Sequence, residues 1–83
     1  MDKADKIYRQ AKSSPNNIRF NDLCLLAERA GFVFDHPNGS HKFFKHSIYK
    51  DVIMNFQNVK GKAKPYQVRQ LIDFIDRHEL LGR

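Results

Sequence analysis

The segment FVFDHPNGSHKFFKH, residues 32–46, constrains the fold more than any other part of this 83-residue chain. Both of its arms are rich in aromatic residues, and this composition predicts strands over residues 32–35 and 40–46. The arms are joined by HPNG, in which Asn38 and Gly39 readily adopt positive φ angles. The segment therefore predicts a β-hairpin, which a chain of this length must pack in few layers of short elements.

Helical patterns lie on both sides of this hairpin, because three sets of apolar residues recur at the spacing of one helix face. The first set predicts a helix over residues 2–12. The second predicts a helix from Asn21 as N-cap to a stop at Gly31, and the third a helix from Pro65 to about Leu81. The sets are, in chain order, Ala4, Ile7, Tyr8 and Ala11; Leu23, Leu26, Ala27 and Ala30; and Val68, Leu71, Ile72 and Ile75.

A further apolar stretch, DVIMNFQ, predicts a third strand from Val52 to about Phe56. The predicted order is thus α-α-β-β-β-α, an α+β fold in one domain over residues 1–83. Residues 1–15 are an additional helix and linker, and residues 20–81 form the core. An α-β-β-β-α order is that of the double-stranded-RNA-binding domain (dsRBD), which has a three-stranded antiparallel sheet with helices on one face.

The positive charge of the chain is concentrated in its middle third. Residues 40–69 contain seven Lys or Arg and a single acid, Asp51, which accounts for a charge of +6; residues 1–39 carry +1 and residues 70–83 carry −1. A localised positive field attracts polyanions, and nucleic acid is the commonest of these. An acidic protein partner is the alternative.

The single cysteine, Cys24, excludes an intramolecular disulfide and is expected to be a small core residue. The N-terminal residues contain no apolar run typical of a signal peptide, and no apolar run approaches the length of a membrane span. We therefore expect a cytoplasmic protein without a membrane partner.

His41 is the strongest candidate for chemistry, because an imidazole titrates near neutral pH and can exchange a proton with a ribose 2′-hydroxyl. Strand alternation places His41 on one face with Phe43 and Lys45, and places Lys42, Phe44 and His46 on the other. A phenylalanine on each face leaves the buried face undetermined. In either case a nearby lysine is expected to stabilise a phosphorane-like transition state. The alternative is that His41 only binds backbone groups of the turn.

A second basic feature, VKGKAKPYQVRQ, leads into the last predicted helix. Its lysines and the free N–H groups of a helix N-terminus favour phosphate, although a solvated loop is the alternative. Metal catalysis is not expected, because no carboxylate cluster or cysteine pair accompanies the histidines. The expected RNA-contacting residues are Gly39, Ser40, Lys42, Lys45, His46, Lys60, Lys62, Lys64 and Tyr66.

Together these segments resemble the HicA-type toxins of bacterial toxin–antitoxin modules. The matching stretches are FNDLCLLAERAGF, NGSHKFFKH and VKGKAKPYQVRQLIDFI, in the family's order, and they span roughly residues 20–77. The chain departs from many members by its helix at residues 2–12. It also has His41-Lys42 where many members have two consecutive histidines.

The resemblance implies a dsRBD-like fold and an mRNA interferase, an endoribonuclease that cuts mRNA without a metal or other cofactor. It assigns the catalytic role to His41 and implies a HicB-type antitoxin as the protein partner. A non-catalytic RNA-binding module and a pure protein-interaction domain are the alternatives.

Overall fold

The computed structural model describes residues 2–82, and the predicted domain ends at residues 1 and 83 lie outside this range. Within it the chain is an α+β fold with three α-helices, one 3₁₀ turn and four strands. In chain order these are α1 Lys3–Ser13, η1 Pro15–Asn17, α2 Phe20–Arg29, β1 Phe32–Asn38, β2 His41–His46, β3 Ile53–Val59, β4 Lys62–Ala63 and α3 Pro65–His78. No helix in this range is long and apolar enough to cross a membrane.

The strands of the described chain form one antiparallel sheet in the order β1-β2-β3-β4. The sequence predicted three strands, and the added strand is β4, which pairs Lys62 and Ala63 with the end of β3. Lysine and glycine are depleted in strands, so the composition gave no sign of this pairing. It arises from a two-residue turn at Lys60 and Gly61, whose φ angles of 53° and 87° suit a tight hairpin.

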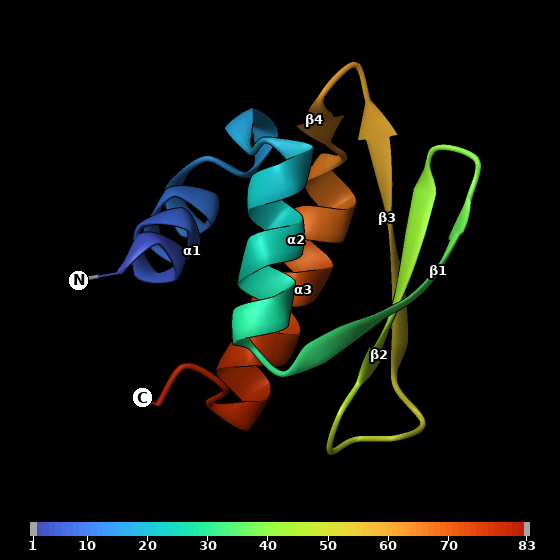
Figure 1. The fold of residues 1–83 in the computed structure, drawn as a ribbon. Coiled ribbons are helices and arrows are strands. Elements are labelled where there is room, and N and C mark those ends of the chain that lie inside the picture. Colours follow the sequence, from blue (N-terminus) through green and yellow to red (C-terminus); the bar gives the residue numbers. More distant parts are fainter. Residues whose placement is uncertain (1, 83) are drawn as a thin grey trace.

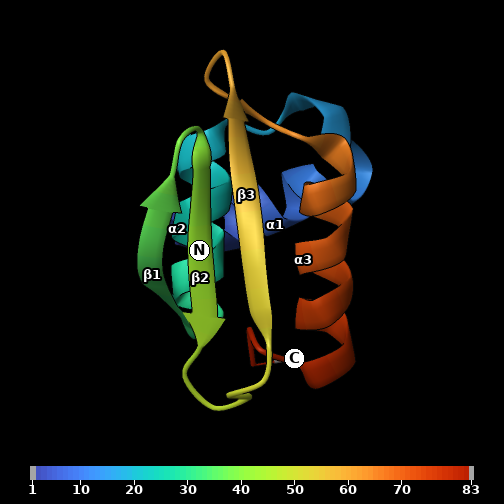
Figure 2. The same ribbon diagram turned by 90° about the vertical axis from the view of Figure 1, so that its right-hand side faces the viewer.

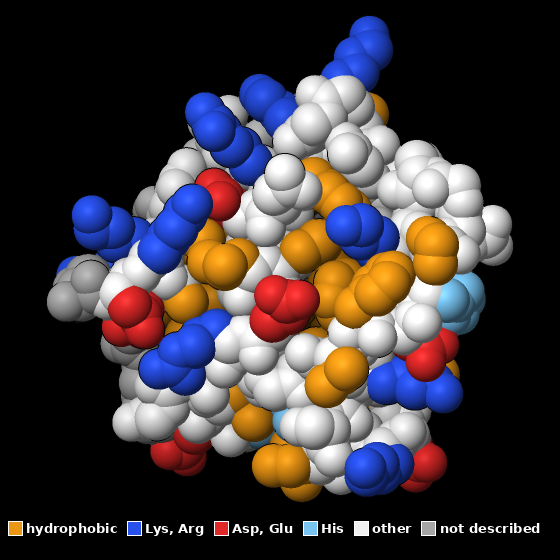
Figure 3. Space-filling view, viewed as in Figure 1, with side chains coloured by type: hydrophobic (Ala, Val, Ile, Leu, Met, Phe, Trp, Pro, Cys, Tyr) orange, Lys and Arg blue, Asp and Glu red, His pale blue; other side chains and the backbone are white. Residues whose placement is uncertain are grey.

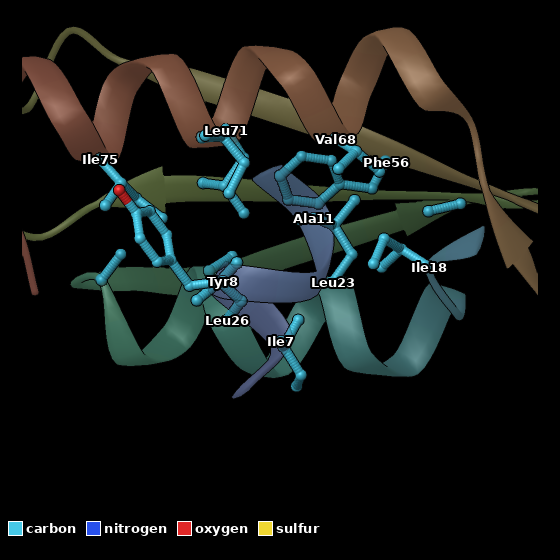
Figure 4. Packing of buried hydrophobic residues seen from close by; sticks show 14 of the residues in the cluster. Ile7, Tyr8, Ala11, Ile18, Leu23, Leu26, Phe56, Val68, Leu71 and Ile75 are labelled. Carbon is cyan, nitrogen blue, oxygen red and sulfur yellow. The ribbon is translucent and has the colours of Figure 1, made fainter. Parts of the chain in front are cut away.

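The helices lie on one side of the sheet, with α2 and α3 next to it and α1 packed against them as a third layer (Figures 1 and 2). Side chains from all three helices and from β3 meet in a single apolar cluster (Figure 4). The three helical stripes predicted from the sequence are buried in this cluster, which confirms them.

The additional helix α1 is joined to α3 by polar contacts as well as by packing. The Tyr8 hydroxyl donates a hydrogen bond to the Asp76 carboxylate, and this bond raises the pKa of Tyr8. Lys12 Nζ lies 2.8 Å from the same carboxylate. These contacts fix α1 on the side of the molecule remote from the sheet.

The two faces of β2 differ sharply in burial, which decides the question that the sequence left undetermined. Phe44 and His46 are 1% and 2% exposed and face the helices. His41 and Phe43 are half-buried and Lys45 is exposed. Strand alternation therefore places His41, Phe43 and Lys45 on the open face of the sheet, the side that faces the viewer in Figure 2.

Helix α2 begins at Phe20 with Arg19 as N-cap, and no side chain caps it, so the prediction of Asn21 as N-cap is wrong. Phe20 is buried, and its N–H donates to the Gly61 carbonyl at 2.9 Å. The start of α2 is thus fixed by the β3–β4 hairpin. Gly31 follows the last turn of α2 with a φ of 104°, as predicted for the residue that ends the helix.

Candidate functional site

His41 is the first residue of β2, directly after the turn at Gly39 and Ser40, and it pairs with Gln57 of β3. Its Nδ1 atom lies 2.9 Å from the side-chain oxygen of Asn55, also on β3. The ring is thus held through one nitrogen at one end of the open face. Asn55 was not identified from the sequence, because its proximity depends on the register between β2 and β3.

Aromatic and charged side chains lie next to His41 along the open face of the sheet. The Phe43 ring lies 6.5 Å from that of His41 and stacks on His36 of β1, with centroids 4.7 Å apart and planes 6° from parallel. Asp35 lies 2.6 Å from His36 Nδ1 and 3.7 Å from Lys45 Nζ. The hydrogen bond with His36, and then the charge of Lys45, lower the pKa of Asp35.

The predicted lysines of β2 do not lie beside His41. Lys45 shares the face of His41, but it lies four positions farther along the strand, which separates the two Cα atoms by roughly 13 Å. Lys42 projects from the other face, where its Nζ atom lies 5.7 Å from the ring centroids of both Phe20 and Phe34. The structure thus gives Lys42 and Lys45 other partners than His41, and their role in stabilising charge beside its ring stays a prediction.

His46 is also not an RNA contact, because it is part of the core. Its Nε2 atom donates to the Ala30 carbonyl at 2.9 Å, and its Nδ1 atom accepts from the N–H groups of Ile48 and Tyr49 at 3.1 and 3.2 Å. Both ring nitrogens are engaged with backbone, so this side chain connects the end of α2 to the β2–β3 loop. The sequence could not show this, since its partners are backbone groups.

The polar turn before His41 and the basic β3–β4 hairpin come together at one end of the sheet. The Asn58 N–H donates to the Ser40 carbonyl at 2.8 Å, and the Asn58 side-chain oxygen accepts from the Gly61 N–H at 2.6 Å. Figure 2 shows both turns at the same end of the molecule. Two regions separated in the sequence therefore form one surface, here called the His41 end.

Basic residues gather at the His41 end. Lys60 and Lys62 are exposed, and the Lys64 Nζ atom lies 6.0 Å from the ring of the exposed Tyr66. In Figure 3 lysine and arginine side chains stand out at the top of the molecule, where Figure 1 places the β3–β4 hairpin and the N-termini of α2 and α3. Asp51 lies in the β2–β3 loop at the opposite end of β2.

Cys24 is partly buried against the apolar cluster, and burial raises the pKa of its thiol from 9.0 to about 11. Because only the thiolate is reactive, we expect alkylation at pH 8 to be about 100-fold slower in the folded protein than in urea. Because the thiol ionises near pH 9 in the unfolded chain but only near pH 11 in the folded protein, the free energy of unfolding is unaffected by this group below pH 9 and falls as the pH rises toward 11. Iodoacetamide labelling followed by mass spectrometry measures the alkylation rates in the folded protein and in urea. Equal rates would contradict the burial of the Cys24 thiol.

Within residues 2–82, no three His, Cys, Asp or Glu side chains are placed to hold a metal ion together. Comparison of the chain with protein-family models, with curated proteins and with solved structures finds no match. The geometry of the His41 end and the open face is therefore the basis for assigning a function.

Proposed function

We propose that this protein is a metal-independent endoribonuclease of the HicA toxin kind, with a dsRBD-like core and His41 as the general acid–base. One observation carries the proposal. A half-buried histidine, held through a single ring nitrogen, lies at the same end of the molecule as a lysine-rich hairpin. Such a histidine can exchange protons with an RNA whose phosphates the lysines hold.

The proposed reaction uses a nucleophile that the RNA itself supplies. His41 accepts the proton of a ribose 2′-hydroxyl, whose oxygen attacks the adjacent phosphorus atom. The bond from phosphorus to the 5′-oxygen breaks, and that oxygen takes a proton from solvent water as it leaves, while His41 returns the proton it accepted to solvent. The products are a 2′,3′-cyclic phosphate and a 5′-hydroxyl end, so the chemistry requires neither a metal ion nor a covalent enzyme intermediate.

The binding part of the proposal assigns the phosphates to the His41 end. Lys60, Lys62 and Lys64 approach the RNA backbone together with Gly39 and Ser40, and Tyr66 adds a hydroxyl near the start of α3. Lys45, farther along the open face, contacts a phosphate remote from the one that is cleaved. The hairpin thus positions the substrate, while His41 acts on it.

The proposed partner is a HicB-type antitoxin that covers the open face and thereby blocks the site. In support, this face exposes two apolar residues, Val33 and Ile53, at 59% and 53%. They lie opposite Lys45 on either side of β2, so an antitoxin that buries them would also cover part of the RNA path.

Incubation of the purified protein with a long RNA in EDTA, followed by a denaturing gel, tests the proposed function. We expect cleavage of the RNA and no cleavage of the same sequence with 2′-O-methyl riboses, which lack the nucleophile. Cleavage of both substrates, or of neither, would overturn the proposal.

The lysine-rich hairpin should dominate the salt dependence of RNA binding. Replacing Lys60, Lys62 and Lys64 by alanine is expected to reduce the slope of log K against log salt by about 2, because each lost phosphate contact on a single strand contributes about 0.7. Removing the same charge from α1, by the triple change of Lys3, Lys6 and Arg9 to alanine, is the control and should leave the slope nearly unchanged. The slopes are measured by RNA titrations from low to high salt. If both triple variants reduce the slope equally, the lysine-rich hairpin is not the main RNA-binding surface.

One observation favours a non-catalytic RNA-binding module as the second candidate. His36, the other histidine on the described open face, stacks on Phe43 and is hydrogen-bonded to Asp35, so the structure shows no second imidazole in contact with the His41 ring. A protein of this second kind would shift RNA on a native gel in EDTA and leave it intact on the denaturing gel.

A further inference from the structure

Asn55 and His41 form the best-defined polar contact on the open face. Asn55 pairs with Phe43 across β2 and β3, while His41 pairs with Gln57, so Asn55 lies diagonally opposite His41 on the same face. Its side-chain oxygen reaches the Nδ1 atom of His41 at 2.9 Å. The contact is therefore set by the register of two strands rather than by a mobile loop.

With the Asn55 side-chain oxygen facing the ring, this contact favours one position for the ring proton. A carboxamide oxygen only accepts hydrogen bonds, so the Nδ1 atom of His41 must be the donor. In the neutral ring, Nε2 is then left with its lone pair and without a proton. An unconstrained neutral histidine favours the opposite form, with the proton on Nε2, so the contact with Asn55 selects the less common tautomer.

We propose that Asn55 is a positioning residue that holds His41 as the Nδ1–H tautomer and so presents the Nε2 lone pair to the ribose 2′-hydroxyl. The inference deepens the proposed function and rests on it. The acid of a Ser–His–Asp triad holds its histidine in the same way. An amide carries no charge, so Asn55 fixes the tautomer without placing a negative charge beside the attacked phosphodiester.

Gln57 provides a matched control, because it lies on the same strand and pairs directly with His41 but has other side-chain and backbone partners. Its side-chain nitrogen donates to the Ser40 hydroxyl at 3.3 Å, and its backbone N–H donates to the Gln67 side-chain oxygen at 2.8 Å. The Gln57→Ala variant therefore disturbs the same region of the sheet without removing the acceptor at Nδ1.

The tautomer is measured by long-range ¹H–¹⁵N NMR of the His41 ring in the RNA-free protein, at a pH where the ring is neutral. We expect Nδ1–H in the wild type, in Gln57→Ala and in Asn55→Asp, whose ionised carboxylate is also purely an acceptor. In Asn55→Ala we expect a shift to Nε2–H. A wild-type ring protonated on Nε2, or an Asn55→Ala ring that keeps Nδ1–H, would overturn the inference.

Kinetics separate positioning from binding. Asn55→Ala is expected to lower kcat by about 10–100-fold, which is less than the about 10²–10⁴-fold that loss of a whole general base costs. KM should change by less than about threefold, because the lysines hold the RNA. An unchanged kcat would overturn the catalytic part of the inference. If the wild type does not cut RNA, the proposed function fails, and the catalytic role of Asn55 fails with it, whatever tautomer the NMR spectrum shows.

Discussion

The His41→Ala variant is expected to cleave RNA about 10²–10⁴-fold more slowly than the wild type, which is the usual contribution of a positioned general acid–base. The fold should persist, because the ring is half-buried and its side-chain hydrogen bond is to Asn55 alone among the described residues. RNA affinity should fall only slightly, since phosphate contacts supply most of it. Initial rates on a long RNA, with circular dichroism as the check on folding, measure the effect.

His36→Ala is the matched control for this prediction. It removes an imidazole from the same face, but one that stacks on Phe43 and is hydrogen-bonded to Asp35. We expect its cleavage rate to stay within about tenfold of the wild type, since a residue outside the reacting atoms supplies no proton transfer. A folded His41→Ala protein with full activity would refute the assignment of His41.

Gly31→Ala is expected to produce the largest loss of stability among single substitutions at the described glycines. The φ of Gly31 is 104°, and an added Cβ would lie 2.8 Å from the Nε2 atom of His46. The His46 ring cannot move aside, because three backbone groups hold it. Backbone strain and displacement of a packed ring each cost about 1–3 kcal/mol, so we expect a total of about 2–6 kcal/mol.

Gly39→Ala separates the two causes of this loss. Gly39 also has a positive φ, of 61°, but no atom lies within 4 Å of an added Cβ. Its substitution should therefore cost only the backbone strain, about 1 kcal/mol. Urea unfolding of both variants gives the comparison. Equal losses of unfolding free energy would show that His46 is not held as the structure indicates.

Local patterns in the sequence predicted the helices well. The apolar stripe of α1 and the stop at Gly31 depend on spacing within one element, and both are confirmed. The start of α2 depends on long-range pairing, because Phe20 bonds to Gly61 and Arg19 bridges Lys62. The strand β4 pairs with β3 across a tight turn, but its two residues are too few to give a strand pattern in the sequence. Composition alone carries no signal for such pairings.

The candidate site was predicted only in part for the same reason. Adjacent phenylalanines at positions 43 and 44 made the two faces of β2 equally apolar, and only the position of α2 and α3 decides that Phe44 is buried. A histidine in a basic strand is expected at the surface, yet His46 is buried, and its partners are backbone groups that folding brings near. The contact between Asn55 and His41 depends on the register of β2 and β3, which the sequence of the loop between these strands does not determine.

End-group analysis of the RNA fragments tests the central claim most directly, because it reports which atom attacked the phosphorus. Wild-type protein, a long RNA and EDTA should give fragments with 5′-hydroxyl and 2′,3′-cyclic phosphate ends, detectable by selective 5′ labelling and mass spectrometry. The Asn55→Ala and His41→Ala proteins should give the same ends, more slowly. Fragments with 5′-phosphate ends would show that water or another nucleophile attacks, and would contradict proton transfer from the ribose 2′-hydroxyl to His41.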